Sequence, residues 1–199
     1  MPRDYTLTGG AFFAADLGIL AAMRYPPSLI ILHWLLALLI FLTFGLATLA
    51  LVPAANTPAK LIPLWAHMAL GLAIFLLTAA RLIIRLRSAR NRRPARKTPL
   101  ARAKPFLAQI AGPVQSLLYA ATLLMSLSGM ALAWQAGYAQ NLRSMPADFY
   151  AFSLRAIHGT LSTLLVILVL FHLLTWVYYQ FLRGENALAW IWFRPRKNR

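Results

Sequence analysis

Four long windows without charged side chains constrain this sequence more than any other feature. No Asp, Glu, Lys or Arg occurs in residues 25–59, 61–80, 105–142 and 156–182. A helix needs about 20 mostly apolar residues to cross a bilayer, so each window has room for one span. The chain has 199 residues, is 60% hydrophobic and contains only four acidic side chains, a balance unlike that of a soluble domain. We therefore predict an all-α integral membrane protein with a four-transmembrane-helix bundle.

The windows also suggest a division of the chain. We expect helices at about residues 28–52, 61–84, 108–134 and 155–182, within a membrane domain of residues 25–183. Residues 1–24 hold a short apolar run interrupted by Asp16. This N-terminal extension either lies at the membrane surface or precedes a native start at Met23. Residues 184–199 form a basic tail.

The distribution of positive charge predicts the orientation. Nine Lys and Arg residues and no acid lie in residues 85–104, between the second and third spans, and more basic residues lie in the tail. Basic loops stay in the cytoplasm, so both termini should be cytoplasmic, in a bacterial inner membrane. The net charge of +16 also raises nucleic acid as a partner, but the basic residues flank apolar spans, which favours the lipid bilayer instead.

The histidines are the candidate functional residues. All four lie in apolar windows: His33, His67, His158 and His172. A single intramembrane histidine often only links helices by hydrogen bonds, whereas four together indicate a shared function. The chain has no cysteine, which excludes disulfides, iron–sulfur clusters, thiolate-bound haem and covalent c-type haem.

Helix geometry predicts how these histidines pair. His158 and His172 are fourteen residues apart, so they point within about 40° of each other and differ in depth by about 21 Å. With cytoplasmic termini, His33 lies at the depth of His172, near the cytoplasm. His67 lies at the depth of His158, near the outer face. We call these the cytoplasmic pair (His33 and His172) and the outer pair (His67 and His158).

Paired imidazoles can fill both axial positions of a haem iron, which favours electron transfer over chemistry at the metal. The sequence therefore predicts two haem b groups, one at each pair. Zinc is the rival, but it usually takes four ligands, and neither depth offers an evident third. The third window supplies no histidine. We interpret Tyr119, Ser126, Ser128 and Gly129 there as packing and hydrogen-bonding residues.

Small and basic residues near the histidines suggest a haem environment. Gly71 follows His67 by one turn on the same face and would leave room for a porphyrin, as Gly159 would beside His158. Ordinary small-residue packing explains them too. Arg81 and Arg85, at the cytoplasmic end of the second span, would either pair with haem propionates or reach lipid headgroups.

Several motifs, in order, resemble the bacterial di-haem cytochrome b561 family from Met23 onward. They are His33-Trp34, His67-x-x-x-Gly71, Arg81-Leu-x-x-Arg85-Leu, Arg155-x-x-His158-x-Thr160-Leu161, His172, Glu185-Asn186-Ala187-Leu188 and Pro195-Arg196-Lys197. The resemblance implies two b-type haems and electron exchange with ubiquinone. For one branch, it implies an enzyme like a superoxide:ubiquinone oxidoreductase.

The donor on the outer side remains open between two hypotheses. A small anion such as superoxide would suit the expected outer charges, Lys60, Arg143 and Arg155 against Asp148. Arg155 precedes His158 by three residues and would steer this substrate, or simply cap the helix at headgroup level. Alternatively, the chain is a non-catalytic haem b anchor and electron conduit for a partner redox protein. A proton-relaying transporter is disfavoured because intramembrane carboxylates are absent.

Overall fold

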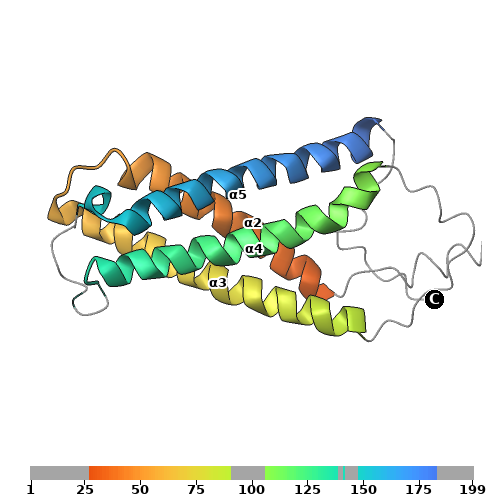
Figure 1. The fold of residues 1–199 in the computed structure, drawn as a ribbon, viewed down its shortest axis with the longest axis horizontal. Coiled ribbons are helices and arrows are strands. Elements are labelled where there is room, and N and C mark those ends of the chain that lie inside the picture. The colour runs from red at the N-terminus through yellow and green to blue at the C-terminus, as the bar shows by residue number, and fades with distance from the viewer. Residues whose placement is uncertain (1–26, 91–105, 139–140, 142–147, 183–199) are drawn as a thin grey trace, which may run out of the picture.

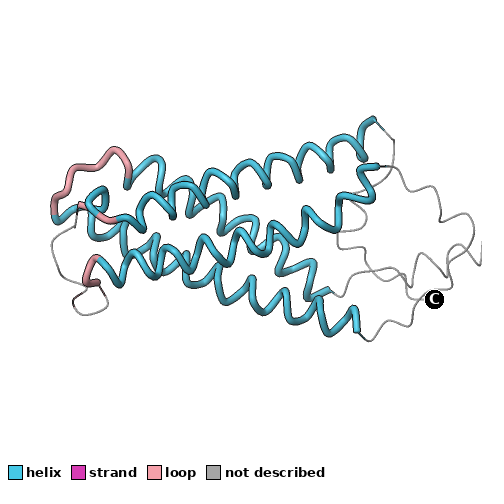
Figure 2. Tube along the Cα trace, in the orientation of Figure 1, coloured by secondary structure: helices cyan, strands magenta, loops and turns pink. Residues whose placement is uncertain are grey.

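The computed structural model describes residues 27–90, 106–138, 141 and 148–182. Every regular element in these ranges is helical, as predicted (Figure 2). Several predictions fall outside the described residues: the extension of residues 1–24, residues 91–104 of the basic loop, Arg143 and the tail of residues 184–199.

The first two spans are each preceded or extended by a short helical segment. Helix α2 (Pro27–Leu46) continues into the π-helical segment η1 (Ala47–Leu51), and the chain turns where Pro53 offers no backbone donor. A 3-10 turn, η2 (Pro58–Lys60), then leads into α3 (Leu61–Arg90). Pro58 begins this turn, where a missing amide hydrogen costs no helical bond.

The last two spans are also accompanied by short helical segments. Helix α4 (Phe106–Gln135) is followed by a 3-10 turn, η4 (Phe149–Ala151), which Asp148 caps by accepting a hydrogen bond from the Tyr150 amide (3.1 Å). Helix α5 (Ser153–Val177) ends in the π-helical segment η5 (Tyr178–Leu182).

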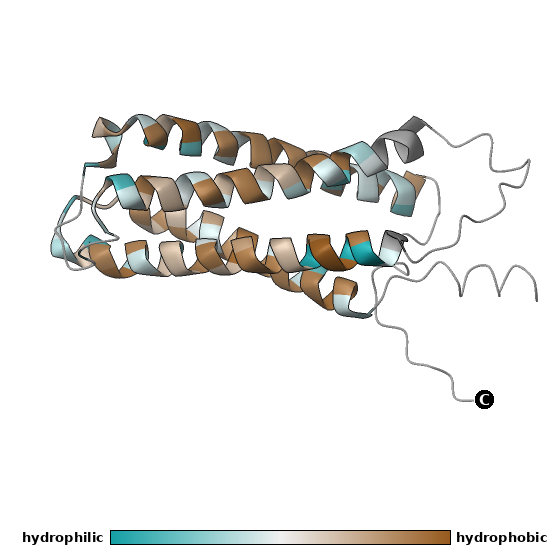
Figure 3. Cartoon of the chain, turned by 60° about the horizontal axis from the view of Figure 1, so that its bottom comes forward, coloured by the Kyte–Doolittle hydropathy of each residue, from teal (hydrophilic) through white to brown (hydrophobic). Residues whose placement is uncertain are grey.

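The four-span prediction is confirmed. Four helices are long and apolar enough to cross a membrane: Pro27–Leu51, Pro58–Ser88, Gly112–Gln135 and Ser153–Leu182. Figure 3 shows apolar residues along most of their length. Large apolar side chains such as Leu38, Leu76 and Ile167 are more than half exposed, as expected of a surface that faces lipid instead of water.

The helices form an up-and-down bundle that is incompletely closed. Backbone contacts join α2 to α3, α3 to α4, and α4 to α5, whereas α2 and α5 do not pack closely against each other. The start of α2, the end of α3, the start of α4 and the end of α5 share one end of the bundle (Figure 1).

One predicted helix boundary is wrong. We expected the second span to end at residue 84, but α3 runs to Arg90. The hydropathy pattern marks where the membrane ends, and arginine is a good helix former, so the helix continues past that point.

A glycine follows the end of α4 and places Tyr138 against the bundle. Gly137 has φ of 81°, a left-handed conformation that L side chains rarely adopt. The next residue, Tyr138, donates its backbone amide hydrogen to the Ala133 carbonyl (3.0 Å) and is almost fully buried. Its ring stacks on Phe149 of η4, with centroids 6.0 Å apart. This contact fixes η4 beside the outer pair of histidines.

Candidate functional site

The bundle brings the four histidines into two facing couples. The ring centroids of His33 on α2 and His172 on α5 are 6.2 Å apart. Those of His67 on α3 and His158 on α5 are 6.3 Å apart. Because α5 contributes to both couples, its fourteen-residue spacing separates them by about 21 Å along the helix axis.

These separations suit a metal ion held between each couple. A bond from an imidazole nitrogen to a transition metal is about 2 Å long, so two rings on opposite sides of one ion have centroids roughly 6 Å apart. Around the outer pair, a cavity lined by all four helices adds room for a planar macrocycle. Nδ1 of His67 is buried with no hydrogen-bond partner among the described residues, while the Thr43 backbone lies within hydrogen-bonding reach of the same ring. The residues present therefore fit haem.

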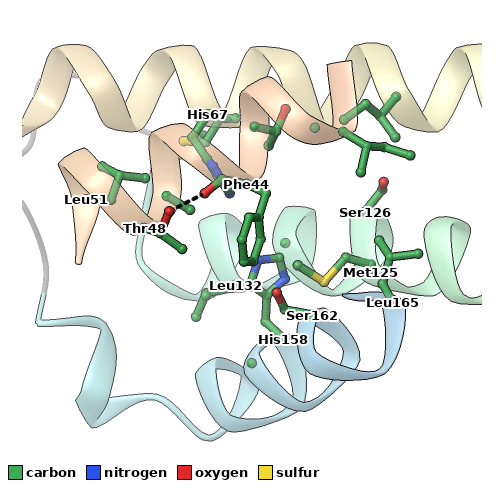
Figure 4. Close-up of a pocket in the computed structure, with 18 of the residues that line it drawn as sticks. Phe44, Thr48, Leu51, His67, Met125, Ser126, Leu132, His158, Ser162 and Leu165 are labelled. Atoms are coloured by element: carbon green, nitrogen blue, oxygen red, sulfur yellow. Dashed lines mark hydrogen bonds between the residues drawn. The ribbon is translucent and has the colours of Figure 1, made fainter. Parts of the chain in front are cut away.

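A large cavity surrounds the outer pair. Its volume is about 1340 Å³, and all four helices contribute to its lining. His67 enters it from α3, His158 from α5 and Phe44 from α2 (Figure 4). Gly71 also lines the cavity, and a Cβ atom at Gly71 would meet nothing within 4 Å. A side chain at this position would therefore extend into the cavity, and a porphyrin beside Gly71 stays a prediction.

Two residues of α4 that we assigned to packing contact His158 instead. The Ser128 hydroxyl oxygen lies 3.0 Å from His158 Nδ1. A Cβ atom at Gly129 would lie 3.0 Å from Cε1 of the same ring. The position of each residue along its helix could have predicted this contact. Ser128 lies seven residues before the end of α4, and His158 lies five residues after the start of α5, so both lie at a similar depth.

Arg155 lies at the outer mouth of this cavity. Its guanidinium carbon is 5.3 Å from the centroid of the Tyr150 ring. Gly159 makes this position possible, because a Cβ atom there would come within 2.8 Å of a guanidinium nitrogen. The Arg155 side chain thus lies along α5 and reaches toward Gly159, one turn further into the span.

Lys60 lines the same cavity and adds a second positive charge. Its amino group donates hydrogen bonds to the Ala54 carbonyl and the Asn56 side chain, both at 3.0 Å. Asp148 is the single carboxylate in the described part of the chain, and it caps η4. The charged side chains among the described residues that line this cavity, Lys60 and Arg155, are therefore both cationic.

Arg81 and Arg85 lie near the cytoplasmic pair and share one aromatic neighbour. Their guanidinium carbons are 5.6 Å and 5.3 Å from the centroid of the buried Tyr119 ring. Arg81 lies in the neighbourhood of both His33 and His172. Tyr119 is thus more than a packing residue, since it contacts both cations.

Fold and site together define a class: a multi-pass helical membrane protein whose intramembrane histidines pair across the bundle. A family model described as "Prokaryotic cytochrome b561" matches residues 24–193. The chain belongs to the prokaryotic cytochrome b561 family and is a membrane haem b electron-transfer protein. No curated protein gives a significant match.

Proposed function

We propose that this cytochrome holds two haem b groups, one between His33 and His172 and one between His67 and His158. The observation that carries the proposal is the pair of ring separations, 6.2 Å and 6.3 Å, which both suit axial coordination. Bound haem would supply a one-electron redox centre at each depth. With both axial positions taken by histidine, neither centre would bind oxygen directly.

The residues around each pair have distinct tasks in this proposal. Gly71 leaves space for the porphyrin beside His67, and Arg81 and Arg85 provide positive charge for propionates on the cytoplasmic side. The basic segments expected at the termini and in the 85–104 loop orient the chain in the inner membrane, with the outer pair away from the cytoplasm.

We further propose that the outer pair accepts electrons from superoxide and that ubiquinone is the final acceptor. Two superoxide ions each lose one electron to become dioxygen, and one quinone takes up the two electrons and two protons to become quinol. Arg155 and Lys60 support this choice, because a positive mouth raises the encounter rate of a small anion. Outer-sphere transfer of an electron needs no general acid or base beside the outer pair.

Stopped-flow mixing of the purified oxidised protein with superoxide tests this function. We expect rapid haem reduction whose rate falls as ionic strength rises. Arg155→Glu should slow it by roughly tenfold, since steering contributes 10-fold or more to such rates. Arg87→Glu is the matched control, because Arg87 is exposed toward the other end of α3.

If the rate of haem reduction changes neither with ionic strength nor in Arg155→Glu, steering by Arg155 is refuted. No reduction by superoxide at all would refute the oxidase function and leave the electron conduit, which a partner redox protein would then have to reduce.

A further inference from the structure

Helix α4 supplies no histidine, yet it holds the ring of His158 on one edge. The Ser128 hydroxyl lies 3.0 Å from His158 Nδ1 and 2.8 Å from the Met125 carbonyl oxygen. Ser128 is only 8% exposed, so little solvent competes for either contact. The contact between Ser128 and His158 is therefore shielded from solvent.

The single proton of the Ser128 hydroxyl determines which partner donates in its two hydrogen bonds. The Ser128 hydroxyl has one proton, and the Met125 carbonyl can only accept, so that proton goes to Met125. The serine oxygen is then free to accept from Nδ1 of His158 in the tautomer that carries its proton there, and the Met125 carbonyl is a second acceptor within reach of the same ring. A neutral imidazole with its proton on Nδ1 has its lone pair on Nε2. Ser128 and the Met125 carbonyl together favour the tautomer whose Nε2 is available to a metal.

Gly129 brings the α4 backbone close enough for this bond. A Cβ atom there would lie 3.0 Å from Cε1 and 3.4 Å from Nδ1 of His158. The contact with Cε1 is tighter than most Cβ contacts, so a larger residue at this position would force the His158 ring to shift by a few tenths of an ångström. The ring of His158 is therefore held by a hydrogen bond and by steric contact with the same helix.

The two members of the outer pair differ in this respect. Nδ1 of His67 is buried without a hydrogen-bond partner among the described residues. Among the described residues, a side-chain hydroxyl therefore contacts Nδ1 of His158 but not Nδ1 of His67.

We propose that Ser128 is a positioning residue that lowers the reduction potential of the outer haem by accepting the Nδ1 hydrogen of His158. The inference rests on the proposed function, because it requires His158 to be an axial ligand. An imidazole that donates a hydrogen bond from one nitrogen is a stronger electron donor through the other, which stabilises oxidised iron over reduced iron. Gly129 supports the same contact sterically.

A redox titration of the full-length haem-loaded protein, followed by visible spectroscopy, tests this inference. In Ser128→Ala, one of the two midpoint potentials should shift to a more positive value, and the other should stay in place. Ser128→Thr keeps a hydroxyl and should keep the wild-type potentials. Ser116→Ala is the matched control, because Ser116 makes a similar bond to a carbonyl on α4, that of Gly112.

Two haems with unchanged potentials in Ser128→Ala would overturn the inference. If Ser128→Ala loses the outer haem, retention at wild-type potential in Ser128→Thr would still support it, and loss in both would overturn it. Failure of the proposed function is distinct: His158→Ala and His67→Ala would then keep both haems, whatever Ser128→Ala does.

Discussion

At the scale of single residues, glycines determine how closely neighbouring side chains of the site approach the helix backbones. Gly129 and Gly159 each leave space that a neighbour uses, namely the ring of His158 and the guanidinium of Arg155. Gly71 is different, because the structure places nothing where its Cβ would be. The open volume beside His67 belongs to the cavity and should be filled by the porphyrin.

Gly71→Leu should therefore reduce haem binding at the outer pair. A leucine side chain one turn from His67 would occupy cavity volume, and overfilled sites accommodate extra methylene groups poorly. We expect the haem content to fall from two per chain toward one, measured by haem extraction against protein concentration. Gly112→Leu, at an exposed helical glycine, should keep both. Full haem content in both variants would contradict this role for Gly71.

The sequence pattern predicts the approach of the histidines but not the contact between Ser128 and His158. Pairing of the histidines by depth follows from helix direction and rise, which are regular in a membrane bundle. The contact between Ser128 and His158 does not follow so directly, because it depends on the rotation of α4 about its axis. That rotation is set by packing against α3 and α5, which a one-dimensional pattern does not encode.

At the scale of elements, the termini of the helices position the outer site. The left-handed Gly137 ends α4, and the buried Tyr138 that follows it stacks on Phe149 of η4. Hydropathy predicted the spans well because lipid contact requires continuous apolar helices. It predicted the end of α3 poorly, because helix propensity and not lipid governs the residues beyond Arg85.

Gly137→Ala should destabilise the bundle and loosen η4. A side chain in the left-handed conformation costs about 1–2 kcal/mol. We expect the thermal unfolding midpoint in detergent to fall by a few degrees, since about 2–4 °C accompany each kcal/mol in a chain of this size. Gly112→Ala lies within α4 and should not lower the midpoint, so equal midpoints for both variants would argue against strain at Gly137.

At the scale of the whole molecule, one helix links the two candidate redox centres. Helix α5 contributes His158 to the outer pair and His172 to the cytoplasmic pair, while α2 and α3 supply one partner each. Since α2 and α5 do not pack closely together, the bundle relies on α3 and α4 to hold its sides at the required spacing. Two centres about 21 Å apart along α5 would cover most of a hydrocarbon core about 30 Å thick.

Haem content and redox titration of the four single histidine variants test this arrangement most directly. His33→Ala and His172→Ala should remove the same redox component, and His67→Ala and His158→Ala should remove the other. The double variant His33→Ala/His172→Ala should then lose no more haem than either single variant. Loss of one common component in His33→Ala and His67→Ala would contradict the pairing, and so would retention of two haems in all four.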